Sequence, residues 1–83
     1  MFTVKFLKYG PVGVDQPTYT EAVVLHQAKE VYVECSDKHG RQVLQLIDAQ
    51  GVPASFTIGT NRVDVMFHKA YVMNEQGRTV ETV

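Results

Sequence analysis

The sequence predicts an all-β fold of six or seven antiparallel strands, arranged as a small barrel or a two-layer sandwich in one small domain over residues 1–83. Fourteen Val, two Ile and seven Thr outnumber four Leu and five Ala, so residues that favour strands dominate over the best helix formers. Apolar and polar residues alternate at a period of two in several segments. The turn pattern Asp/Asn-x-x-Gly occurs three times, at residues 37–40, 48–51 and 74–77. Tight turns of one kind between alternating segments are typical of an antiparallel meander.

The first strand is predicted from Phe2 to the Gly- and Pro-rich stretch at residues 10–13, because Phe2, Val4 and Phe6 alternate with less apolar neighbours. We expect these three side chains to face the core. Residues 10–18 are predicted to form the longest and most mobile loop. This loop is the first choice for a ligand contact, although most long connections only join two elements.

Two interpretations are open for residues 19–29. We expect a strand over residues 19–25 with a kink near residues 27–28, because two adjacent Val residues are β-branched and the apolar residues do not recur at helical spacing. The alternative is a helix over residues 20–29, which would make the fold α+β. Residues 18–21 have the spacing of a helix capping box, which favours that alternative.

A central hairpin is predicted over residues 29–48, with a tight turn that Asp37 begins and Gly40 ends. Its register follows from the alternation, because a slip of one residue would turn every side chain to the other face. The residues expected on the core side are Val31, Val33 and Cys35, opposite Leu44 and Leu46. The residues expected together on the other side are Tyr32, Glu34 and Gln45.

Three more strands are predicted after this hairpin. Residues 52–58 show the most regular alternation, with Pro53 at the start of the strand or on a sheet edge because it has no N–H to donate. The alternation over residues 63–73 is long for one strand, so we expect a bulge or break near residues 68–69. Residues 70–83 form the last hairpin. The predicted core comprises Phe2, Val4, Phe6, Val24, Val31, Val33, Cys35, Leu44, Leu46, Val52, Phe56, Ile58, Val65 and Val72.

The sequence offers no catalytic, cofactor-binding or metal-binding residues, and we expect the protein not to be an enzyme. Cys35 is the only cysteine, so an intrachain disulfide cannot form and a reducing compartment, the cytoplasm, is expected. His26, His39 and His68 lack the close spacing of zinc ligands. On the core side of its strand, Cys35 would have a raised thiol pKa, which is the wrong direction for a nucleophile. Gly-rich phosphate loops and nucleophile elbows are also missing from the sequence.

The charge balance does not favour nucleic acid or membrane as a partner, because the formal net charge is −1. We expect no membrane span, since no segment approaches the roughly 18 apolar residues that a span requires. The N-terminal residues read as a strand and not as a signal peptide. The alternative function is that of a small β-barrel that binds single-stranded nucleic acid by stacking. The residues available for it are Tyr9, Tyr19, Tyr32 and Tyr71, with Lys5, Lys8, Arg41, Arg62 and Lys69.

Three segments carry a resemblance to a group of known proteins. They are the opening MFTVKFLKYG, the middle AKEVYVE and the ending AYVMNEQGRTV at residues 70–80, which is the most specific of the three. In these segments the chain resembles small, uncharacterised β proteins encoded by tailed bacteriophages. The resemblance implies an accessory, host-interacting or virion-associated protein in the bacterial host cytoplasm or the virion. It supplies no catalytic or binding residues.

We therefore expect a non-catalytic binding or assembly module whose partner is itself, as a homo-oligomer, or another protein. A strand at each end of the chain would leave sheet edges uncovered, and uncovered edges offer unpaired N–H and C=O groups to a neighbour. The alternative is a monomer whose first and last strands pair and close a barrel. The candidate partner contacts are Tyr9, Tyr19, Tyr32, Tyr71, Val80 and Val83.

Overall fold

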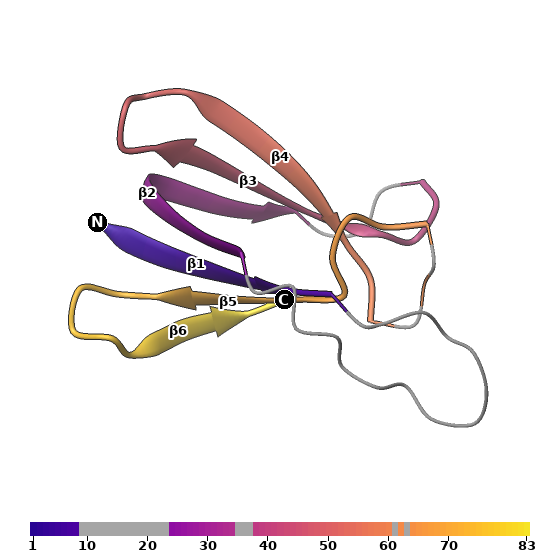
Figure 1. The fold of residues 1–83 in the computed structure, drawn as a ribbon. Helices are drawn as coiled ribbons and strands as arrows, with labels where there is room; N and C mark the ends of the chain where they lie inside the picture. The colour runs from indigo at the N-terminus through magenta and orange to yellow at the C-terminus, as the bar shows by residue number, and fades with distance from the viewer. Residues whose placement is uncertain (9–23, 35–37, 61, 63) are drawn as a thin grey trace.

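The computed structural model describes residues 1–8, 24–34, 38–60, 62 and 64–83, and in them it confirms the all-β fold. Antiparallel pairing joins six strands into one sheet of order β4-β3-β2-β1-β5-β6 (Figure 1). The strands are β1 (Phe2–Leu7), β2 (Val24–Glu34), β3 (Gln42–Asp48), β4 (Pro53–Ile58), β5 (Lys69–Met73) and β6 (Thr79–Thr82). The described residues contain no helix, and the sheet is not closed into a barrel.

Strand β2 resolves the ambiguous segment, because residues 24–29 lie within this strand and not in a helix. Residues 19–23 lie outside the described residues. The predicted kink is confirmed as a bulge: Ala28 is opposite Asp48 and Glu30 is opposite Ile47, so Lys29 has no partner on β3. The bulge divides β2 into a first half that pairs with β1 and a second half that pairs with β3.

The register of the central hairpin is also confirmed. Val31 is opposite Leu46 and Val33 is opposite Leu44. Cys35 and Asp37, for which we predicted a core position and the start of the turn, lie outside the described residues. The glycines that end the three predicted turns all have positive φ, with values of 79° at Gly40, 84° at Gly51 and 77° at Gly77.

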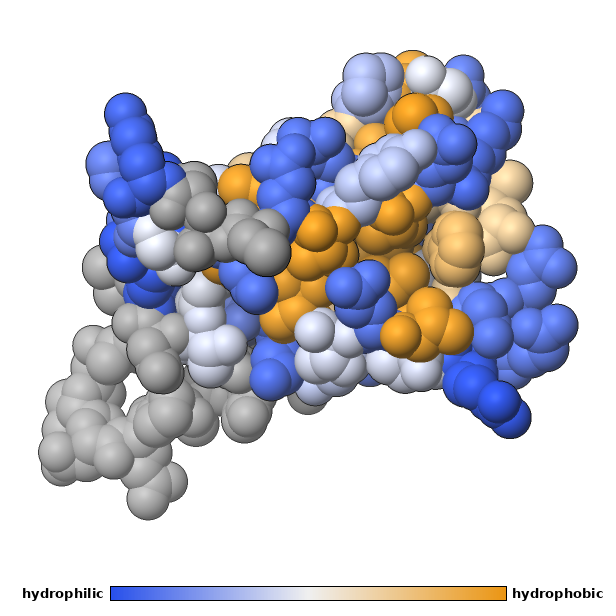
Figure 2. Space-filling model, turned by 180° about the vertical axis from the view of Figure 1, so that it is seen from behind, coloured by the Kyte–Doolittle hydropathy of each residue, from blue (hydrophilic) through white to orange (hydrophobic). Residues whose placement is uncertain are grey.

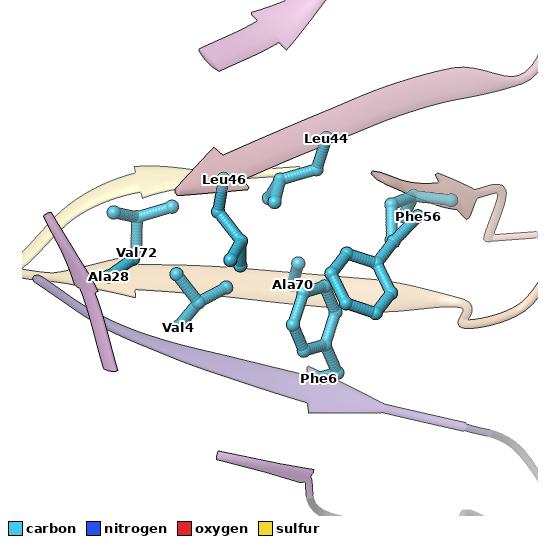
Figure 3. Close-up of a cluster of buried hydrophobic side chains, with 9 residues drawn as sticks. Val4, Phe6, Ala28, Leu44, Leu46, Phe56, Ala70 and Val72 are labelled. Atoms are coloured by element: carbon cyan, nitrogen blue, oxygen red, sulfur yellow. The ribbon is translucent and has the colours of Figure 1, made fainter. Parts of the chain in front are cut away.

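The sheet bends so strongly that side chains of β4 pack on those of β1. Strands β1 and β4 are three spacings apart in the sheet, which would separate them by about 14 Å if the sheet were flat. The rings of Phe6 and Phe56 nevertheless lie 4.5 Å apart between centroids. The core therefore fills the inside of the bend, where side chains of β3 and β4 meet those of β1 and β5 (Figure 3). Its buried members are Val4, Phe6, Ala28, Leu44, Leu46, Phe56, Ile58, Ala70 and Val72.

Most of the predicted core is confirmed, and Val52 is the clear error because its side chain is 55% exposed. Its N–H donates to Asp48 Oδ1 at 2.8 Å and its carbonyl oxygen accepts from the Asp48 N–H at 3.0 Å, so Val52 closes a turn before β4 begins. Two alanines that we did not predict as core residues are buried, Ala28 on β2 and Ala70 on β5. Val65 is buried, while Phe2, Val24, Val31 and Val33 are partly buried at the margin of the core.

The long strand predicted over residues 63–73 is shorter than expected, because β5 begins only at Lys69. This agrees with the break predicted near residues 68–69. The chain before the break closes onto the end of β4 instead, where the N–H groups of Met66 and Phe67 both donate to the Thr57 carbonyl oxygen at 3.1 Å. His68 is buried beside this loop, and its Nε2 lies 2.7 Å from the Arg62 carbonyl oxygen.

Candidate interaction surface

The bend in β2 divides the outer surface of the sheet into two faces. The first consists of the outward side chains of β3, β4 and the second half of β2, which we call the acidic face. Its residues are Glu30, Tyr32, Glu34, Val43, Gln45, Ile47, Pro53, Ser55 and Thr57. The second consists of the outward side chains of β1, β5 and the first half of β2, which we call the basic face. Its residues are Thr3, Lys5, Leu7, Leu25, Gln27, Lys69, Tyr71 and Met73.

Tyr32 lies on the acidic face between Glu30 and Glu34, near the end of β2. Its side chain is 52% exposed, and Gln45 and Ser55 follow it in one row across β3 and β4. A depression of about 370 Å³ lies over these strands, lined by Tyr32, Gln45, Leu46, Ile47, Pro53, Ala54 and Ser55. The predicted grouping of Tyr32 with Glu34 and Gln45 on one face is thus confirmed.

The two glutamates of the acidic face form hydrogen bonds with Gln45 and with the Tyr32 hydroxyl. The Gln45 side-chain amide donates to Glu34 Oε1 at 3.3 Å. A hydrogen bond with the Glu30 side chain, together with the negative charge of Glu30, raises the pKa of the Tyr32 phenol above its usual value. The Tyr32 side chain presents an apolar ring with a polar tip, a combination that is common at protein interfaces.

The basic face is built around Lys5 of β1, which lies opposite Leu25 of β2 on one side and Tyr71 of β5 on the other. Lys69 follows on β5, opposite Leu7. Leu25 is 60% exposed, so this face also combines charge with apolar area.

Near one end of the basic face, the Gln27 amide donates to the Thr3 hydroxyl at 3.0 Å. A second depression, of about 350 Å³, is lined there by Met1, Thr3, Gln27, Met73, Asn74, Glu75 and Gly77. The Glu75 carboxylate at its rim accepts a hydrogen bond from the Met1 amino group at 2.5 Å, which lowers the pKa of Glu75.

The sequence-predicted contact residues do not form one surface. Tyr32 lies on the acidic face and Tyr71 on the basic face, whereas Tyr9 and Tyr19 lie outside the described residues. Val80 is 53% exposed on β6, but Val83 is partly buried against the core. The residues that sequence reasoning missed are Leu25 and Ile47, which strand pairing places on the same faces as Tyr71 and Tyr32.

Among the strands that the structure describes, β4 and β6 are the edges of the sheet, and β1 lies in the interior between β2 and β5. The loop that bonds to Thr57 covers one end of the β4 edge, and Pro53 at the other end has no N–H to donate. The β6 edge has four residues, and its register shifts opposite Val72 and Met73. Short length, proline and bulges are devices that reduce edge-to-edge pairing.

Charged groups also gather at the loop that precedes β5, where they stabilise the loop. Arg62 donates from Nε to Asp64 Oδ1 and from a terminal nitrogen to Asp64 Oδ2, both at 2.9 Å. Arg41 lies 4.0 Å from the same carboxylate. This pairing, mainly the hydrogen bonds from Arg62, lowers the pKa of Asp64 to about 2. Among the described residues no group of three His, Cys, Asp or Glu side chains could hold a metal ion.

Comparisons with models of protein families, with curated proteins and with solved structures gave no match. The part of the chain that the structure describes contains no helix with the length and hydropathy to cross a membrane. Viewed from behind, the molecule has hydrophobic side chains in the middle of its surface and hydrophilic ones around them (Figure 2). This side of the molecule is therefore an apolar area bordered by hydrophilic residues.

Proposed function

We propose that the protein is a non-catalytic binding or assembly module whose contact surface is the acidic face. The observation that carries this proposal is the half-exposed ring of Tyr32 beside a depression lined largely by apolar side chains. Aromatic residues in such positions supply much of the binding energy of protein interfaces. Three paired strands also hold the face rigid, so little conformational entropy is lost when a partner binds.

The expected partner is a protein, either a second copy of the chain or a different one. The resemblance of residues 70–80 to tailed-bacteriophage proteins supports an accessory, host-interacting or virion-associated role. In that setting the module would act in the bacterial cytoplasm or in the virion.

Replacement of Tyr32 by Ala tests this proposal. We expect the variant to keep its circular dichroism spectrum, because the side chain is half exposed, and to lose its partner in light scattering or in affinity capture from bacterial lysate. Val80→Ala is the matched control, since Val80 is 53% exposed on β6, which lies at the opposite edge of the sheet from β4. Equal binding by wild type and Tyr32→Ala would refute the assignment of this face.

A second candidate function, binding of single-stranded nucleic acid, is favoured by the basic face, where Lys5 lies directly beside Tyr71. A ring next to cationic side chains is the arrangement that stacks bases and attracts phosphates. Titration of labelled single-stranded DNA and RNA at low salt tests it. Binding should weaken steeply with salt and disappear in Lys5→Glu. Failure to bind at low salt would remove this candidate.

A further inference from the structure

We infer that the acidic face of one copy binds the basic face of a second copy. This inference rests on the proposed function, because it names the partner of the acidic face. Among the described residues, the side chains that strand pairing places on the acidic face include Glu30 and Glu34 and no Lys or Arg, and the exposed Lys29 stands beside Glu30 at the bulge. Those of the basic face include Lys5 and Lys69 and no Asp or Glu. The two faces of one chain are thus complementary in charge.

The positions of the charges also suit a face-to-face contact. Glu30 and Glu34 are four residues apart on one strand, which separates them by roughly 13 Å. Lys5 and Lys69 lie on adjacent strands two residues apart in register, a separation of roughly 8 Å. The long lysine side chains can span the difference while their methylene groups cover apolar neighbours.

Apolar side chains lie next to the charges on both faces. Tyr32 and Ile47 on the acidic face would meet Leu25 and Tyr71 on the basic face. Burial of these groups would supply affinity, and the charges would set the orientation and exclude contacts between two like faces. A net charge of −1 leaves little overall repulsion between copies.

The contact is heterologous, because each copy uses a different face toward each neighbour. Such contacts produce rings where the rotation closes and filaments where it does not. Three strands by five residues give each face roughly 240 Å², well below the roughly 800 Å² per partner of a standard interface. We therefore expect weak association, seen at high protein concentration and reduced by salt.

The test uses two charge-reversed double variants in sedimentation velocity at low salt. The first is Glu30→Lys with Glu34→Lys, and the second is Lys5→Glu with Lys69→Glu. Each variant alone has two faces of like charge and should sediment as a monomer. The mixture should associate again, because the basic faces of the first variant can bind the acidic faces of the second. Lys38→Glu with Arg78→Glu is the matched control for the second variant, since it makes the same change in net charge at exposed positions outside both faces. This control should associate like wild type.

Each result bears on the inference. Restored association in the mixture supports it and shows that both variants are folded. Association that survives in both variants but is lost in Val80→Lys would overturn it in favour of pairing through β6. A wild type that stays monomeric at every concentration would also overturn it, but would leave the proposed function intact if Tyr32→Ala still lost a captured protein. If monomeric wild type bound single-stranded nucleic acid and the second variant did not, the basic face would belong to that ligand instead.

Discussion

Truncation of Phe56 to Ala tests the central feature of the fold, the packing of β4 across the bend onto β1. The Phe56 side chain is 8% exposed, and its ring lies 4.5 Å from that of Phe6 and 5.9 Å from that of Phe67. Removal of a buried Phe ring costs about 3–5 kcal/mol, since transfer free energy is lost and a cavity remains. A chain of 83 residues has a free energy of unfolding of about 4–12 kcal/mol, so the loss is a large share of the total.

The measurement is thermal and urea unfolding followed by circular dichroism. Each kcal/mol shifts the midpoint of a domain this small by about 4–8 °C, so Phe56→Ala should melt at least about 12 °C below wild type. Val52→Ala is the control, because Val52 follows the same alternation but is 55% exposed, and its loss should cost under about 0.5 kcal/mol. Similar midpoints for the two variants would show that the bend does not bring β4 onto β1. If Phe56→Ala does not fold, Phe56→Leu should give a smaller shift in the same direction.

Two further predictions concern Asp64 and Lys29. The Asp64 carboxyl should titrate near pH 2 by NMR, and its pKa should rise toward 3.8 in Arg62→Met. Because the folded pKa is the lower one, the ion pair stabilises the fold above about pH 4, and this contribution is lost as the pH falls through 2. Deletion of Lys29 should prevent folding, because it removes the extra residue of the bulge and turns the side chains of one half of β2 to the other face. The measurement is the loss of amide dispersion in NMR spectra, and a folded deletion variant would contradict the role of the bulge. Lys29→Ala keeps the bulge and should melt near wild type.

The sequence was sufficient to predict the strands and their local pairing, since both depend on patterns within short segments. The alternation of Val31 and Val33 against Leu44 and Leu46 excluded a register slip of one residue, because such a slip would move the side chains of one strand to the other face. The alternation gave a wrong prediction at Val52, which continues the pattern of β4 but is exposed. Its N–H donates to the Asp48 carboxylate in the turn before β4.

The buried residues that we did not predict are of types whose hydropathy gives little indication of burial. Ala28 and Ala70 are small, so their burial follows from close approach of strands and not from their hydropathy. His68 is polar, and it is buried because its ring reaches the Arg62 carbonyl oxygen under the loop. The basic face could not be predicted for a related reason. Its members come together only because β1 lies between β2 and β5, and those strands are far apart in the sequence.

The bulge at Lys29 connects the core to the proposed surface. In β2 the even-numbered residues Val24 to Ala28 face inward before the bulge, and the odd-numbered Val31 and Val33 face inward after it. One extra residue thus keeps both halves of the strand in contact with the core while their directions diverge. The outward side chains diverge with them, so Glu30 and Glu34 belong to a different face from Leu25. Without the extra residue, Glu30 and Glu34 would continue the even-numbered alternation of Val24 to Ala28 and would face the core. Because the strand bends, the opposite charges lie on separate faces and can pair between copies.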